Sequence, residues 1–148
     1  MHINFARLLV LCFGFLVLFI AYDSAQNLSG HVLEENGFGN MGFYSLSALY
    51  LVFGVSCLFA LSIVKAVGTK FCLVIGSLCY TAFTGCFIMP ALSNQNPDFS
   101  VSRSTIKWTV ILGGAVCGFG ASILWVAAGQ YISQCASDKT KGTFFGVF

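Results

Sequence analysis

Long stretches without a charged side chain constrain this sequence more than any other feature. Residues 36–64, 71–97 and 108–137 contain no Asp, Glu, Lys or Arg, and a shorter stretch of the same kind lies between Arg7 and Asp23. An α-helix rises ~1.5 Å per residue, so about 20 apolar residues cross a hydrocarbon core ~30 Å thick. Only 8% of the 148 residues are charged, whereas soluble domains carry roughly 25%. The sequence therefore predicts an integral membrane protein.

The apolar stretches predict an all-α, polytopic membrane protein with transmembrane helices near residues 5–25, 44–64, 72–92 and 108–131. Helices are favoured over strands because the runs are unbroken and backbone groups in lipid must pair within the segment. The first stretch follows a basic residue as a signal peptide does, but it lacks a small-x-small cleavage site, so we expect it to be retained. Residues 142–148 turn apolar again, which predicts the start of a fifth helix from residue 143 and a longer, transporter-like protein.

The basic residues predict the orientation in the membrane. An N-terminus inside the cell places five of them on the cytoplasmic side, namely Arg7, Lys65, Lys70, Lys139 and Lys141. Two, Arg103 and Lys107, then lie outside. Cytoplasmic loops carry the excess of Lys and Arg, so we expect a cytoplasmic N-terminus. Nothing in the sequence indicates which organelle holds the protein.

Several classes of chemistry find no support in the sequence. The net charge of +2 provides no basic field for nucleic acid. No Cys-x-x-Cys pair, Ser/His/Asp set, paired carboxylates or phosphate-binding loop is present, so we expect no metal, no cofactor and no enzymatic activity. Cys72, Cys79 and Cys86 recur every seven residues and are interpreted as small packing residues on one helix face.

Polar residues near the end of the first helix are the strongest candidates for a site. Asp23, Gln26 and Asn27 share one helix face by their spacing, and an intramembrane carboxylate is a functional candidate by default. This face could line a central cavity or bind a cation, to which Gln130 of the fourth helix could contribute; the alternative is an interfacial helix end solvated by headgroups. Asn27 also begins an Asn-x-Ser glycosylation pattern, but it abuts the membrane, so we expect no glycan.

Small residues in the fourth helix predict close helix packing. Gly114 and Gly118 form a Gly-x-x-x-Gly pattern, with Ser122 one further step along. Such spacing lets helices approach closely, and packing within the bundle is favoured over dimerisation. Trp125, in the same helix, is interpreted as a packing aromatic.

Several short strings, taken in their order and spacing, resemble the Unc-ninety-three ion-channel regulatory protein family, a branch of the major facilitator superfamily. They are Phe19-Ile-Ala-Tyr22, Gln26-Asn-Leu28, Gly42-Phe-Tyr-Ser45 with Tyr50, Lys65-Ala-Val-Gly68, Gly76-Ser-Leu-Cys-Tyr80, Ser122-Ile-Leu-Trp125-Val-Ala-Ala-Gly129-Gln130 and Lys141-Gly142. The resemblance covers residues 5–148. It implies a twelve-helix fold of two six-helix bundles, of which this chain would supply part of the N-terminal bundle.

The resemblance also implies a function. A transporter-like protein that regulates an ion channel or a membrane receptor, or joins a larger membrane assembly, is the favoured reading; a secondary transporter of a small solute, in full-length form, is the alternative. Transporting relatives carry a Gly-x-x-x-Asp-Arg-x-Gly-Arg type of motif between helices 2 and 3. Here Lys65, Gly68 and Lys70 remain of it and the acidic residue is absent, which weakens the case for active transport.

Overall fold

The computed structural model describes residues 2–95 and 101–148, and these residues form helices without any β-strand. The six helices are α1 His2–Glu35, α2 Met41–Val67, α3 Thr69–Cys86, α4 Ile88–Gln95, α5 Arg103–Cys135 and α6 Lys141–Val147. Residues 96–100, which include Pro97 and Asp98 of the polar segment before α5, lie outside the described residues.

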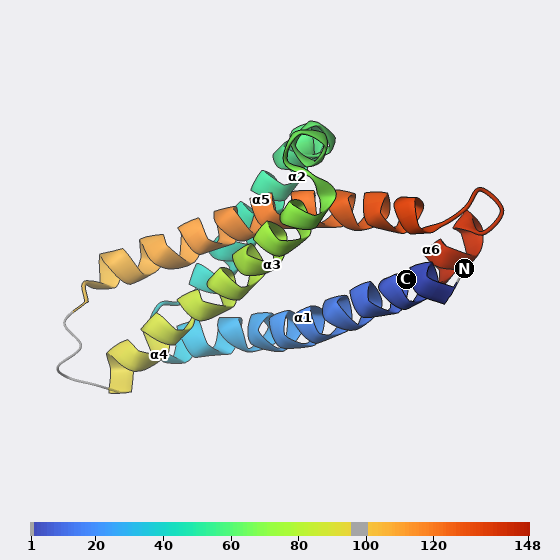
Figure 1. Ribbon diagram of the computed structural model, residues 1–148. Helices are drawn as coiled ribbons and strands as arrows, with labels where there is room; N and C mark the ends of the chain where they lie inside the picture. The colour runs from blue at the N-terminus through green and yellow to red at the C-terminus, as the bar shows by residue number, and fades with distance from the viewer. Residues whose placement is uncertain (1, 96–100) are drawn as a thin grey trace.

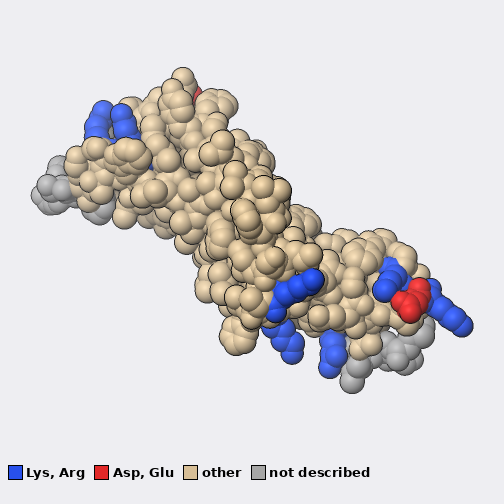
Figure 2. Space-filling model, turned by 90° about the horizontal axis from the view of Figure 1, so that it is seen from above, with Lys and Arg blue, Asp and Glu red and all other residues tan. Residues whose placement is uncertain are grey.

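Four helical segments are long and apolar enough to cross a membrane. They are Asn4–Glu35, Met41–Val67, Thr69–Ser93 and Arg103–Cys135, with mean hydropathies between 1.9 and 2.4. Figure 2 shows one group of Lys and Arg side chains at one end of the molecule and the others spread over the opposite half, with an uncharged stretch between them. The prediction of an all-α, polytopic membrane protein is confirmed.

The helix α5 is the centre of the bundle. It lies between α2 and α3 (Figure 1). In the most apolar 18-residue stretch of α5, 56% of the residues are buried, whereas 6% are buried in the corresponding stretch of α1. Its many small residues explain this position, because they let two neighbouring backbones approach on two faces. The helix α1 runs in the opposite direction to α5 (Figure 1) and packs loosely, leaving many of its apolar side chains exposed.

The first helix extends ten residues beyond the expected end at residue 25, to Glu35. It stops where Gly37 adopts φ +77°, a left-handed conformation that glycine reaches at little cost. The N–H of Phe38 donates to the carbonyl of Leu33 at 2.8 Å and that of Gly37 to Glu34 at 3.0 Å. This pair of bonds is a Schellman motif, completed by the packing of Phe38 with Leu33 in one buried cluster. The end signal is therefore Gly37, and polar residues before it remain helical.

The other helix boundaries follow from single residues. Gly68, with φ +99°, is the whole connection between α2 and α3, and that left-handed conformation favours glycine. The span expected as one helix over 72–92 is divided at Phe87 into α3 and α4. Pro90 has no N–H to donate to the carbonyl of Cys86, which removes one helical hydrogen bond at this point.

The two faces of α5 use different glycines. On the α2 side, a Cβ at Gly114 would lie 2.5 Å from the carbonyl oxygen of Ser45, and one at Gly118 would overlap the carbonyl oxygen of Leu49. The Gly-x-x-x-Gly pattern thus lies at the α2–α5 contact. Ser122 is fully buried and its hydroxyl donates to the carbonyl of Phe119 in its own helix at 2.7 Å.

The α3 side of α5 is a second close contact, which the sequence did not single out. A Cβ at Gly113 would lie 2.7 Å from the sulfur of Cys86, and one at Gly120 would overlap Cys79. Cys72 is fully buried in the adjoining cluster with Ile123. The cysteine stripe of α3 therefore packs against α5, which confirms the packing interpretation of these thiols.

Candidate functional site

The polar residues Asp23, Gln26 and Asn27 lie on α1 toward the end of the molecule where α1 turns into α2. Asp23 and Asn27 are exposed and Gln26 is half-buried. Asn27 lines a shallow pocket of about 220 Å³ together with His31, Glu34 and the turn into α2. The side chain of Ser29 donates to the carbonyl of Gln26 at 2.6 Å, so the backbone of this turn is satisfied locally. The polar side chains of Asn27, His31 and Glu34 therefore share one small pocket.

Gln130 lies far from this group. Its side-chain oxygen accepts a hydrogen bond from the hydroxyl of Thr69 at 3.3 Å, at the start of α3. The adjacent Tyr131 shares a groove with Arg7, and the step from position 7 to position 23 corresponds to about 24 Å of helix. The structure therefore does not bring Gln130 together with Asp23, Gln26 and Asn27. Gln130 instead faces a pocket of about 650 Å³ that Lys65 and Lys70 also line.

An aromatic cluster joins α1 to α3 and α5 in the middle of the bundle. The rings of Tyr22 and Tyr80 meet edge to face with centroids 4.7 Å apart. Trp125 contacts Phe19 at 5.4 Å and Phe15 at 5.7 Å between centroids. Edge-to-face pairs are favourable beyond their buried area, so this cluster holds the loosely packed α1 against the rest. Trp125 packs as expected on one side, and 45% of its surface is exposed on the other.

The two tyrosines also line a small pocket that sequence reasoning missed. It has a volume of about 330 Å³ between α1 and α3, and Thr81 and Thr84 lie beside Tyr22 and Tyr80. Both threonine hydroxyls donate to carbonyls of their own helix. Tyrosines inside an otherwise apolar span were the available signal, but their meeting across two helices was not visible in the sequence.

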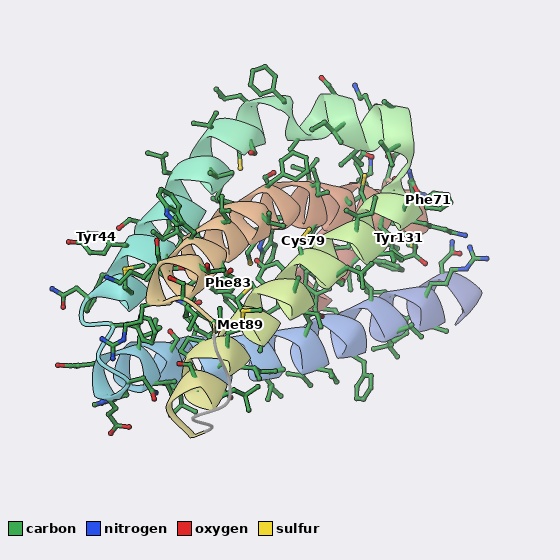
Figure 3. All side chains as sticks on the ribbon, turned by 90° about the vertical axis from the view of Figure 1, so that its left-hand side faces the viewer. Tyr44, Phe71, Cys79, Phe83, Met89 and Tyr131 are labelled. Carbon is green, nitrogen blue, oxygen red and sulfur yellow. The ribbon has the colours of Figure 1, made fainter. Side chains whose placement is uncertain are left out.

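A longer apolar groove lies between α1 and α3 toward the opposite end. It has a volume of about 470 Å³, and Arg7 and Lys70 stand beside it with Tyr131. Its walls are the apolar side chains of both helices, among them Val10, Leu18, Leu73 and Leu78. Figure 3 shows Tyr131 and Phe71 at this end of the bundle, above α1, with Tyr44 at the other end.

Metal-ligating residues do not gather within residues 2–95 and 101–148, where no group of three or more His, Cys, Asp or Glu side chains could hold an ion. All seven cysteines lie in this part of the chain as free thiols. Its one ion pair joins Lys141 to Asp138 on the exposed turn before α6, at 2.9 Å.

Comparison with known proteins places the chain in a family. The family profile described as "Ion channel regulatory protein UNC-93" matches residues 38–148, which is most of the chain. The chain belongs to the UNC-93 family. Its UNC-93 region includes α2 to α6 and hence both close contacts of α5.

Curated UNC-93 relatives match almost the whole chain at modest identity. The UNC93-like protein MFSD11 of Xenopus tropicalis is 28% identical over 96% of this chain and 29% of its own length. Protein unc-93 homolog A of Bos taurus is 30% identical over 98% of this chain and 30% of its own length. UNC93-like protein 3 of Arabidopsis thaliana is 30% identical over 94% of this chain and 27% of its own length. The chain thus spans about three-tenths of the length of these relatives. No solved structure matches it.

Proposed function

We propose that this UNC-93 chain is the N-terminal membrane part of a non-enzymatic regulatory protein that associates with an ion channel or a membrane receptor. The observation that carries the proposal is the family match over residues 38–148, described as an ion channel regulatory protein. A regulator of this kind acts through contacts between transmembrane helices rather than through a reaction centre. The partner would therefore contact a helix face that the bundle leaves exposed.

The outward face of α2 is suited to that contact. Leu51, Val55 and Leu58 recur at helical spacing and are 71%, 57% and 78% exposed, while Ser45 and Leu49 on the other side of α2 are buried against α5. Tyr44 continues the exposed stripe and points away from the bundle in Figure 3. Within lipid, helices associate through van der Waals packing and interhelical hydrogen bonds. A transmembrane helix of the channel is the occupant proposed for this stripe.

The test places a photocrosslinking residue at Leu58 in cells that express the protein, with the exposed Val17 of α1 as the control position. We expect a crosslink from position 58 to the pore-forming subunit of a channel, and a changed current when the two are reconstituted together. Crosslinks to lipid alone, with no change in current, would contradict the proposal.

We also infer that the N-terminus is cytoplasmic. Arg7 and Lys70 stand beside the same groove, and Lys65 lies with Lys70 in the neighbouring pocket. Lys139 lies in the turn before α6, Lys141 is the first residue of α6, and Phe144 of α6 lies in one buried cluster with Leu8. The basic end of the bundle thus gathers residues that are far apart in sequence, and positive residues favour the cytoplasmic side. Labelling of a cysteine introduced at Asn36 by a membrane-impermeant reagent from outside the cell supports this orientation; labelling from the cytoplasmic side reverses it.

We further propose that the helices α1 to α5, with α6 as the beginning of the next span, are part of the N-terminal six-helix bundle of a major facilitator fold. Secondary transport of a small solute is the second candidate, favoured by the exposed Asp23 and by the pocket that Asn27, His31 and Glu34 line. Alternating access needs two bundles around a midplane site, so uptake is measured in a form as long as the relatives. Solute-dependent uptake that the Asp23→Asn substitution abolishes would favour transport. If uptake and channel regulation are both unchanged in Asp23→Asn, the polar residues of α1 do not form a functional site.

A further inference from the structure

The groove between α1 and α3 is apolar along most of its length and cationic at one end, a combination that a simple packing defect does not explain. Along most of its length the walls are apolar, contributed by Val10, Gly14 and Leu18 of α1 and by Leu73, Val74 and Leu78 of α3. At one end stand the cations Arg7 and Lys70, with Tyr131 beside them. The volume of about 470 Å³ lies within the ~300–1,000 Å³ range of small-molecule sites.

The polar atoms inside the groove are already used within α3. The hydroxyl of Ser77 donates to the carbonyl of Leu73 at 2.8 Å, and that of Thr81 donates to the carbonyl of Ser77 at 3.0 Å. These side chains therefore present their apolar parts to an occupant. The hydroxyl hydrogens of Ser77 and Thr81 are thus not free to donate to an occupant, and most of the remaining lining is apolar, which favours a hydrocarbon occupant.

The cations at the end of the groove have no acidic partner among the described residues. The ion pair of this part of the chain joins Lys141 to Asp138, and Asp23, Glu34 and Glu35 belong to the second half of α1, remote from Arg7. A guanidinium and an ammonium at a membrane surface recognise phosphate oxygens. Basic pockets between transmembrane helices bind the headgroups of anionic lipids.

We propose that the α1–α3 groove binds one anionic phospholipid, with the headgroup phosphate at Arg7 and Lys70 and an acyl chain along Gly14 toward Leu18. The lipid comes from the leaflet on the basic side of the bundle. An apolar protein helix would fill the groove but leave the two cations unpaired, and a free phosphate would leave the apolar walls uncovered. Because α1 has few other contacts, the lipid would bridge α1 to α3 and stabilise their packing. This inference stands independently of the channel partner.

The experiment measures thermal stability of the purified chain in detergent while a phospholipid is added. Short-chain phosphatidylglycerol is compared with phosphatidylcholine of the same acyl chains, and glycerol phosphate serves as a headgroup without a tail. We expect phosphatidylglycerol to raise Tm in a saturable manner, with weaker stabilisation by phosphatidylcholine and none by glycerol phosphate. Equal effects of the two lipids, or stabilisation by glycerol phosphate alone, would overturn the proposal.

Two sets of variants test the two ends of the lipid separately. Arg7→Gln with Lys70→Gln should weaken phosphatidylglycerol binding by about 5-fold per residue and up to about 30-fold together. The matched control is Arg103→Gln with Lys107→Gln at the other end of the bundle, which should bind phosphatidylglycerol as the unchanged chain does. Retained binding in the first pair contradicts the headgroup assignment.

The acyl part is tested at Gly14, where an added Cβ meets no other atom within 4 Å. Gly14→Leu should therefore fold normally, fill the groove and abolish stabilisation by either lipid. Gly54→Leu is the matched control, because Gly54 is equally unobstructed and lies on α2, away from the groove. If Gly14→Leu binds phosphatidylglycerol unchanged, the lipid is not in this groove.

Discussion

The side chain of Ser45 donates a hydrogen bond to the backbone carbonyl of Val110 at 2.8 Å, in the buried contact between α2 and α5. The carbonyl of Ser45 in turn lies where a Cβ at Gly114 would be. The close approach of the two helices and the hydrogen bond depend on each other, because the hydroxyl reaches the neighbouring backbone only when a glycine keeps the helices near.

The Ser45 hydrogen bond gives the first prediction. Ser45→Ala should lower the free energy of unfolding by about 0.6 kcal/mol and by no more than about 1.7 kcal/mol, the range for interhelical hydrogen bonds in membranes. Unfolding of the protein in mixed micelles by increasing denaturing detergent measures the change. Ser62→Ala on the exposed side of α2 is the control and should have no measurable effect; equal losses in both variants contradict the assignment.

Gly118 gives the second prediction. Its Cβ would overlap the carbonyl of Leu49, so Gly118→Ala should push α2 from α5 and cost about 1–3 kcal/mol, as overpacking does. Gly129 lies in the same helix with no atom within 4 Å of an added Cβ. Gly129→Ala should be neutral or stabilise by up to about 1 kcal/mol, the helix propensity difference. Unfolding in mixed micelles measures both changes. An unchanged free energy of unfolding in Gly118→Ala would be inconsistent with this packing.

Gly37 gives the third prediction, which concerns backbone conformation rather than space. Its φ of +77° costs an L-residue about 1–2 kcal/mol, so Gly37→Ala should lower Tm and loosen the turn between α1 and α2. Limited proteolysis at this turn, together with thermal unfolding, measures the effect. Gly30→Ala, inside α1 where an added Cβ meets no atom within 4 Å, should not lower Tm; a fall of the same size there points to a general intolerance of alanine.

The exposed pair of Asp138 and Lys141 gives the fourth prediction. The Lys141 ammonium donates to the carboxylate at 2.9 Å, and this hydrogen bond with the positive charge lowers the pKa of Asp138 below its ordinary value of 3.8. Because the folded pKa is the lower one, the contribution of the pair to stability is present above pH 3.8 and is lost as the pH falls through the folded pKa. An NMR titration of the Asp138 carboxyl measures the midpoint.

The controls for this titration are two charge removals. Lys141→Gln should return the Asp138 midpoint toward its ordinary value, whereas Lys139→Gln should leave the midpoint low, because Lys139 makes no ion pair with Asp138. A midpoint that does not respond to Lys141→Gln shows that the pair is absent in solution.

Much of the architecture was predictable because lipid imposes a simple rule. A stretch without charge that is long enough to cross hydrocarbon has to be a helix, since backbone groups have no other partners there. This rule located all four spans, and the sequence pattern of Gly114 and Gly118 indicated close packing of the last. The rule says little about helix ends, because ends lie in water or headgroups. Gly37 and Pro90 decided those ends through backbone chemistry, which is why α1 extends to Glu35 and the third span is divided at Phe87.

The sequence by itself determined that this chain is a membrane protein with four candidate spans and that its motifs resemble one family. Hydropathy and local motifs can be read along the chain without knowledge of its packing. Only the tertiary structure decided that Gln130 is remote from Asp23, that Tyr22 meets Tyr80, and that Arg7 and Lys70 border one groove. Those relationships depend on how helices are arranged side by side: the glycines of α5 set the approach of α2 and α3, and aromatic contacts place α1 against α3 and α5. Helical periodicity states which residues share a face, but the neighbour of each face follows from packing.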